Sequence, residues 1–129
     1  MSWPQPLRRL QPFSPQPLLD RFHLEAAADW SNGSLRLVFR LQGPLQQLCL
    51  PIPTTAAERR DGLWQSTCFE AFVAVPGQAA YWEINICPSG HWNVYGLSSY
   101  RQGLQAEPSV QQLPFALRRD LQAGGGELL

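Results

Sequence analysis

The sequence predicts an all-β protein, an antiparallel β-sandwich with about eight or nine strands. Apolar and polar residues alternate over several short segments, which is typical of strands with one buried face. Turn motifs with the sequences SNGS, PGQA and PSG separate these segments at hairpin spacing. With 129 residues, 44% of them hydrophobic and only 16% charged, the chain has the size and composition of one packed domain.

The chain divides into an arm, a domain and a tail. Residues 1–20 include five prolines, and we expect them to lie on the surface as a polyproline-like arm, because proline cannot donate to a central strand. Residues 21–122 carry the alternating segments and form the predicted β-sandwich domain. Residues 123–129 include three consecutive glycines and are expected to be a flexible tail.

The first predicted hairpin precedes a loop region. Apolar residues alternate from Arg21 to Trp30, the Asn-Gly of SNGS supplies a tight turn, and a second alternating strand follows from Leu35 to Gln42. The short apolar run LQQLCLPIP is stopped by two prolines. Residues 54–63 have too little periodicity to indicate a full helix and are predicted to be a loop that contains at most one helical turn.

Three further strands, at 67–75, 81–87 and 91–95, form a predicted meander with short connections. Opposite residues of an antiparallel pair share a face, so the register follows from the side chains. One pairing places Trp82 opposite Val73 and Trp92 opposite Ile86, on a face that is wholly apolar. We therefore expect both tryptophans to belong to the core.

The same register gives the opposite face an unusual composition. Its predicted rows, read across the three strands, are Cys68, Cys87 and His91, then Glu70, Asn85 and Asn93, then Phe72, Glu83 and Tyr95. Aromatic faces together with amides and carboxylates are the groups that bind sugars and similar polyols. The alternative is that these side chains bond to each other and to nearby arginines as part of a plain sheet.

The chain shows no motif that indicates catalysis. Two carboxylates on adjacent strands would suit a glycosidase, but a general acid and a nucleophile cannot be singled out, so no enzyme is predicted. Cys68, Cys87 and His91 lack a fourth ligand and the spacing of a zinc site, and we expect no metal and no cofactor.

Charge and hydropathy limit the partners. Ten basic residues balance ten acidic ones, which gives no field to attract nucleic acid or anionic lipid. No apolar run is long enough for a signal peptide or a membrane span, and the three cysteines contain no CxxC pair. These features predict a cytoplasmic protein with reduced thiols that binds neither nucleic acid nor membrane.

The segment from Asp61 to Gly103 contains a Trp loop, the phrase CFEAFV, an aromatic-Glu-x-Asn strand, a Pro-Ser-Gly turn, then WNVY and a later Tyr-Arg. It resembles the DOMON-like and carbohydrate-binding module family 9-like superfamily. That resemblance implies a jelly-roll sandwich that binds sugars or, in other branches, haem. It also implies a ligand-side sheet surrounded by Trp64, Glu70, Glu83, Asn85, Asn93 and Arg101. Haem branches use a methionine and a histidine as axial ligands, whereas the only methionine here is Met1.

The end of the chain is short for such a fold, with one further strand predicted at 115–121. Too few strands would leave apolar sheet surface open. We expect an incomplete second sheet, a homodimer or partner chain that covers the open edge, or a truncated gene product. The predicted function is a non-catalytic module that binds a small carbohydrate or sugar-like metabolite. Its alternatives are a protein interaction domain without a small ligand and, last, a haem-binding redox domain.

Overall fold

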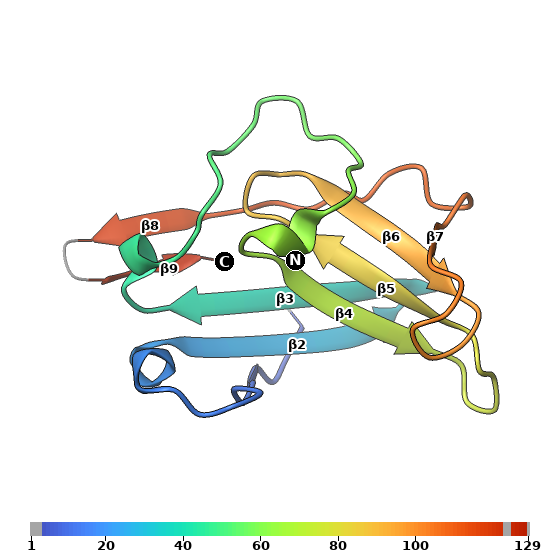
Figure 1. Cartoon of the computed structure of the whole chain (residues 1–129), viewed down its shortest axis with the longest axis horizontal. Helices are drawn as coiled ribbons and strands as arrows, with labels where there is room; N and C mark the ends of the chain where they lie inside the picture. The colour runs from blue at the N-terminus through green and yellow to red at the C-terminus, as the bar shows by residue number, and fades with distance from the viewer. Residues whose placement is uncertain (1–3, 123–124, 129) are drawn as a thin grey trace. The chain divides into compact units, whose positions relative to one another are not determined.

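The computed structural model describes residues 4–122 and 125–128 and is all-β, with two antiparallel sheets (Figure 1). The strands are β1 (Arg8–Arg9), β2 (His23–Ser31), β3 (Ser34–Gln42), β4 (Phe69–Ala74), β5 (Tyr81–Ile86), β6 (Trp92–Leu97), β7 (Gln105–Ala106), β8 (Arg119–Gln122) and β9 (Gly125–Leu128). The 3₁₀ helices are η1 (Pro17–Arg21), η2 (Leu45–Gln47) and η3 (Leu63–Gln65). In the described ranges, no helix has the length and apolar character needed to cross a membrane.

The chain separates into two compact units. Unit 1 comprises Met1–Leu48 with Leu117–Leu129, and unit 2 comprises Cys49–Ala116. Each unit has its own sheet, in the order β1-β2-β3-β9-β8 in unit 1 and β4-β5-β6-β7 in unit 2. The two units are therefore described separately.

The predicted first hairpin forms the centre of unit 1. β2 and β3 pair along their whole length, and Asn32 and Gly33 make the turn with φ angles of 53° and 77°. Ion pairs cross the hairpin on one face, where Arg40 contacts Glu25 at 2.6 Å and Arg36 contacts Asp29 at 2.7 Å. The hydrogen bond from Arg40 lowers the pKa of Glu25 from its ordinary value.

Both ends of the chain contribute strands to unit 1. In the arm, β1 pairs with β2 at the edge of the sheet, a position that a proline-rich segment tolerates. The last predicted strand begins later than expected, at Arg119, where β8 starts.

The predicted tail differs most from the structure. Residues 125–128 form β9, which pairs with both β3 and β8, while residues 123, 124 and 129 lie outside the described residues. Glycine is a poor strand former, and this is why the segment looked like a tail. At Gly126, however, a Cβ atom would lie 2.8 Å from the Asp120 carbonyl oxygen and 2.9 Å from Leu45 Cδ1, so the lack of a side chain is what permits this packing.

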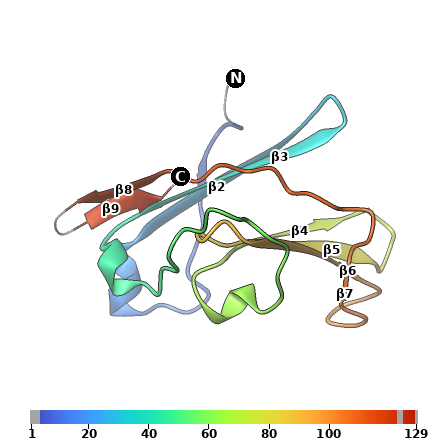
Figure 2. The same ribbon diagram turned by 90° about the horizontal axis from the view of Figure 1, so that it is seen from above.

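The sheet of unit 2 confirms the predicted register. Val73 lies opposite Trp82, Ile84 opposite Val94, and Ile86 opposite Trp92. Trp92 is buried as expected, whereas Trp82 is half-buried and donates its indole N–H to Glu107 Oε2 at 3.3 Å. The strand β7 was not predicted; it pairs with the C-terminal half of β6. Figure 2 shows η3 and its surrounding loop on one side of this sheet.

Candidate ligand-binding face

The polar rows predicted from the sequence lie on one face of the unit 2 sheet. Glu70 lies opposite Asn85, which lies opposite Asn93, and the next row runs from Phe72 through Glu83 to Tyr95. We call the surface formed by Glu70, Phe72, Tyr81, Glu83, Asn85, Asn93 and Tyr95 the polar face. Alternation alone places these side chains together, since residues two apart in a strand share a face.

The loop around η3 covers part of the polar face. Gly62, in the left-handed conformation with φ of 74°, begins the turn of η3, and η3 contacts β5. On this loop Asp61 Oδ1 accepts a hydrogen bond of 2.7 Å from the Tyr95 hydroxyl. The ring of Trp64 lies 6.4 Å from that of Tyr95, at an angle of 60°. Burial and the adjacent Asp61 carboxylate both raise the pKa of Tyr95, so its hydroxyl remains a donor.

Asn93 is a structural residue within this face. Its Oδ1 accepts hydrogen bonds from Arg59 Nε and from the backbone N–H of Val94, both at 2.8 Å. Its Nδ2 donates to the Arg60 carbonyl at 2.9 Å and to Asp61 Oδ1 at 3.1 Å. These four hydrogen bonds satisfy the amide and tie the loop to the sheet, so Asn93 has little capacity left for a ligand.

Arg59 lies at the outer side of β6 and completes this network. Its guanidinium donates to three backbone carbonyls at 2.7 to 3.0 Å, those of Val94, Glu107 and Val110. It also lies 5.2 Å from the ring centroid of Trp92. The arginine therefore joins the residue 58–60 segment, β6 and the segment after β7.

Asn85, in contrast, has no hydrogen-bond partner. Its side chain is 0% exposed, and neither Oδ1 nor Nδ2 is bonded to any of the described residues. A buried amide without partners costs about 1 to 3 kcal/mol, and such groups are uncommon in native proteins. An unsatisfied amide in the centre of a polar row indicates a group whose partners come from outside the chain.

One carboxylate of the polar face, that of Glu83, affects the pKa of the other. Glu83 is half-buried on the central strand, and Glu70 lies at the exposed margin on β4. Partial burial and the charge of Glu83 raise the pKa of Glu70 above its ordinary value. Burial, followed by the charge of Glu70, raises the pKa of the neighbouring Cys68 thiol to about 12. This thiol is therefore protonated at neutral pH and weakly nucleophilic.

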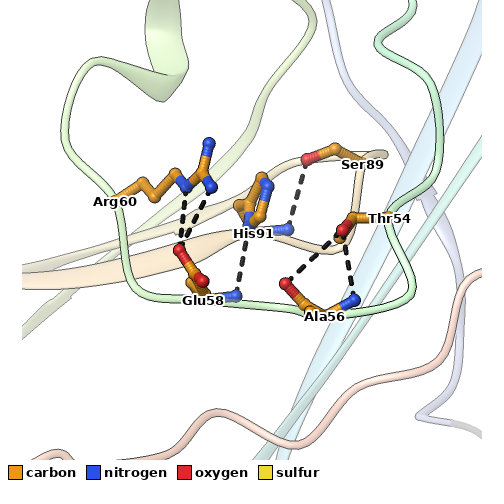
Figure 3. Close-up of polar contacts among 6 residues, drawn as sticks. All are labelled: Thr54, Ala56, Glu58, Arg60, Ser89 and His91. Carbon is orange, nitrogen blue, oxygen red and sulfur yellow. Dashed lines mark hydrogen bonds and ion pairs between the residues drawn. The ribbon is translucent and has the colours of Figure 1, made fainter.

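His91, which shares the first predicted row with the two cysteines, fixes a loop (Figure 3). Its ring Nδ1 accepts a hydrogen bond of 3.1 Å from the backbone N–H of Glu58, and the backbone N–H of His91 donates to Ser89 Oγ at 3.2 Å. The Thr54 N–H donates to the Ser89 carbonyl at 2.7 Å. Across residues 4–122 and 125–128, no three histidine, cysteine or acidic side chains are grouped so that they could hold a metal ion.

Arg101, the last of the predicted site residues, forms no ion pair with the described carboxylates of the polar face. It has a φ of 57° in the turn after β6, and its guanidinium lies 5.4 Å from the ring centroid of Tyr100. Only its backbone N–H meets the polar face, through a 3.1 Å hydrogen bond to the Tyr81 hydroxyl. The structure thus places Trp64, Glu70, Glu83, Asn85 and Tyr95 together, with Asn93 already bonded and the Arg101 guanidinium over Tyr100.

Two residues that organise the face, Arg59 and Asp61, were not predicted. They belong to the irregular segment 54–63, where alternation gives no information about direction. The Asp-Gly pair in this segment was a signal for a turn, and Gly62 does adopt the left-handed conformation. The turn signal alone could not predict that Asp61 would contact Asn93 and Tyr95.

A hollow of about 270 Å³ lies at the other end of the sheet, lined by Trp82, Gly96 and Glu107 among others. Both carboxylate oxygens of Glu107 are already engaged, one by the Ser109 hydroxyl at 2.7 Å and the other by Trp82 at 3.3 Å. Because the Glu107 carboxylate and the Trp82 indole already have partners, this hollow is a weaker candidate than the polar face.

Comparison with known proteins gives no relative: no protein-family model, curated protein or solved structure matches the chain.

Proposed function

We propose that unit 2 is a non-catalytic module that binds a small carbohydrate or sugar-like metabolite on the polar face. The observation that carries this proposal is the Asn85 amide, which is fully buried and has no hydrogen-bond partner among the described residues. A sugar hydroxyl can both accept from Nδ2 and donate to Oδ1, so one ligand group satisfies the amide. We infer that ligand entry requires the loop of η3, which contacts β5, to move away from Asn85.

Aromatic rings at the margin of the polar face support the same class of ligand. Trp64 is 51% exposed and Phe72 is 61% exposed, although large apolar side chains are usually buried. Sugars stack the C–H side of their rings on such surfaces while their hydroxyls bond to amides and carboxylates. Trp64 and Phe72 would therefore flank the hydroxyl-binding groups Glu70, Glu83 and Asn85.

The finer structural expectations belong to this proposal. We retain a jelly-roll-like β-sandwich, supported by the antiparallel pairing of both sheets, and membership of the DOMON-like superfamily, supported by the motif from Asp61 to Gly103. Cytoplasmic location, the absence of a cofactor and the absence of catalysis are parts of the same proposal.

A second candidate function is an interaction or assembly domain, and one observation favours it. β4 is the outermost strand of its sheet, and the exposed Phe72 lies on it. An edge strand with an exposed aromatic side chain can pair with a strand of a partner chain or of a second copy. In this case no small ligand would be needed.

A thermal-shift panel of mono- and disaccharides tests the proposal, because a ligand that binds only the folded state raises its melting temperature. We expect at least one sugar to raise the melting temperature of the wild type and to lose this effect in Trp64→Ala. Trp30→Ala is the matched control, since Trp30 is also exposed, at 68%, but lies in unit 1. If no sugar shifts the wild type, or if both variants keep the shift, the proposal is wrong.

A further inference from the structure

The carboxylates of the polar face have no positive partner within the described residues. Neither Glu70 nor Glu83 takes part in an ion pair or a side-chain hydrogen bond there, although each ion pair that is present joins an acidic residue to an arginine or histidine. The sequence contains no lysine that could supply the missing charge. Two neighbouring carboxylates that share one face without a cation repel each other.

The arginines of unit 2 are committed elsewhere. Arg59 bonds to Asn93 and to three backbone carbonyls, Arg60 contacts Glu58 at 3.1 Å, and the Arg101 guanidinium lies over Tyr100. The fold therefore brings two carboxylates together, and within the described residues no arginine of the same unit forms an ion pair with them. The repulsion also appears in Glu70, whose pKa is raised by burial and by the charge of Glu83.

Aromatic rings beside the carboxylates favour a cation as well. Phe72 lies directly opposite Glu83, and its ring is 6.2 Å from that of Tyr81 at an angle of 56°. The negative face of an aromatic ring attracts an ammonium group, particularly where water is partly excluded. Carboxylates and rings thus converge on the same short stretch of β4 and β5.

Asn85 adds an independent sign of a ligand. It lies opposite Glu70 and two residues from Glu83 on β5, so its side chain projects from the same face between the two acids. Its fully buried amide has no partner among the described residues, so Oδ1 needs a donor and Nδ2 needs an acceptor. A bare metal ion could bind only Oδ1, and a purely apolar ligand could satisfy neither atom. The expected ligand therefore combines a positive charge with a hydroxyl.

We propose that the ligand of the polar face is a hydroxylated amine of the amino-sugar class, whose ammonium group lies between Glu70 and Glu83 while a neighbouring hydroxyl pairs with Asn85. This inference rests on the proposed function and specifies its ligand. The ammonium offsets one of the two negative charges and reduces the repulsion between the carboxylates. Phe72 and Tyr81 contact the ammonium and the adjacent C–H groups, and Trp64 covers the sugar ring.

Three sugars with the same ring distinguish a site for an ammonium group from a site for a neutral sugar. Glucosamine at about pH 6 carries a protonated amine, whereas glucose and N-acetylglucosamine are neutral. We expect isothermal titration calorimetry to give glucosamine an affinity at least about tenfold higher than either neutral sugar, and we expect added salt to reduce that advantage. If a neutral sugar binds as tightly as glucosamine, this inference fails and the proposed function stands. If none of the three binds and the wider sugar panel is also negative, both fail.

Variants of the two carboxylates test whether these groups bind the ammonium. Glu83→Gln and Glu70→Gln should each remove most of the preference for glucosamine, while Glu58→Gln, which changes an exposed acid paired with Arg60, should leave it unchanged. Circular dichroism checks that each variant is folded. Should Glu83→Gln not fold, Glu70→Gln and the salt dependence of the wild type still decide the question. An equal preference in all variants would overturn the inference.

Discussion

Asn85 and Asn93 lie opposite each other on adjacent strands, and both are buried, yet their surroundings differ completely. The region around Asn93 is closed: loop, strand and arginine satisfy both atoms of its amide with four hydrogen bonds. The region around Asn85 places an amide beside two carboxylates, and none of the three groups has a partner among the described residues. The same residue type in the same row therefore serves two purposes, stabilising the fold in one case and, as we propose, receiving a ligand in the other.

The largest effect should come from Asn93→Ala. The substitution leaves Arg59 Nε and the Arg60 carbonyl without their partner, and we expect the free energy of unfolding to fall by roughly 3 kcal/mol in urea titrations. Asn85→Ala is the matched control and should cost much less, because it breaks no hydrogen bond within the described residues. Equal losses for the two variants would remove the distinction between the two regions.

A smaller effect of opposite sign is expected for Asn85→Leu. Leucine has a similar branched shape, and it removes two polar atoms that are buried without partners, so the free energy of unfolding should rise by about 1 kcal/mol. Urea unfolding of the ligand-free protein measures this change. A clear loss of stability would mean that Asn85 makes hydrogen bonds in the free protein, and the closed and open regions would then be alike.

The smallest effect concerns pH. Because the pKa of Glu70 is raised on folding, its contribution favours the folded state below the ordinary value of 4.5 and is lost as pH rises through the folded pKa. Melting temperatures of Glu70→Gln should therefore exceed those of the wild type at neutral pH and converge with them toward pH 4.5. Glu25→Gln, at an ion-paired acid with a lowered pKa, should show the opposite order at neutral pH. If both variants melted above the wild type at neutral pH, or both below it, the opposite pKa shifts assigned to Glu70 and Glu25 would be contradicted.

Regular strands could be predicted from the sequence, and with them most of the polar face. Alternation places Glu70, Glu83 and Asn85 on one surface because a side chain in a strand has only two directions available. The same rule correctly joins Trp82 and Trp92 on the opposite face. The conclusion holds only for residues inside strands.

Features that depend on irregular backbone could not be predicted. Asp61 and Arg59 reach Asn93 from a loop whose path has no periodicity, so neither their direction nor their partners follow from spacing. β9 was missed for another reason, since glycine disfavours strands locally while close packing at Gly126 requires it. Consequently the sequence could show which amides share a row but not which of them already has its bonds.

Arg59 also has a consequence for the outer border of the unit 2 sheet. Along the outer side of β6, the segment at residues 58–60 pairs with Trp92 and β7 pairs with Tyr95 and Gly96, while the guanidinium takes the Val94 carbonyl between them. A carbonyl that is already bonded cannot template the stacking of strands from another molecule. The Val94 carbonyl also accepts a hydrogen bond of 2.8 Å from the Glu107 N–H, so backbone pairing and the arginine together leave this border with few free groups that a strand of another molecule could pair with.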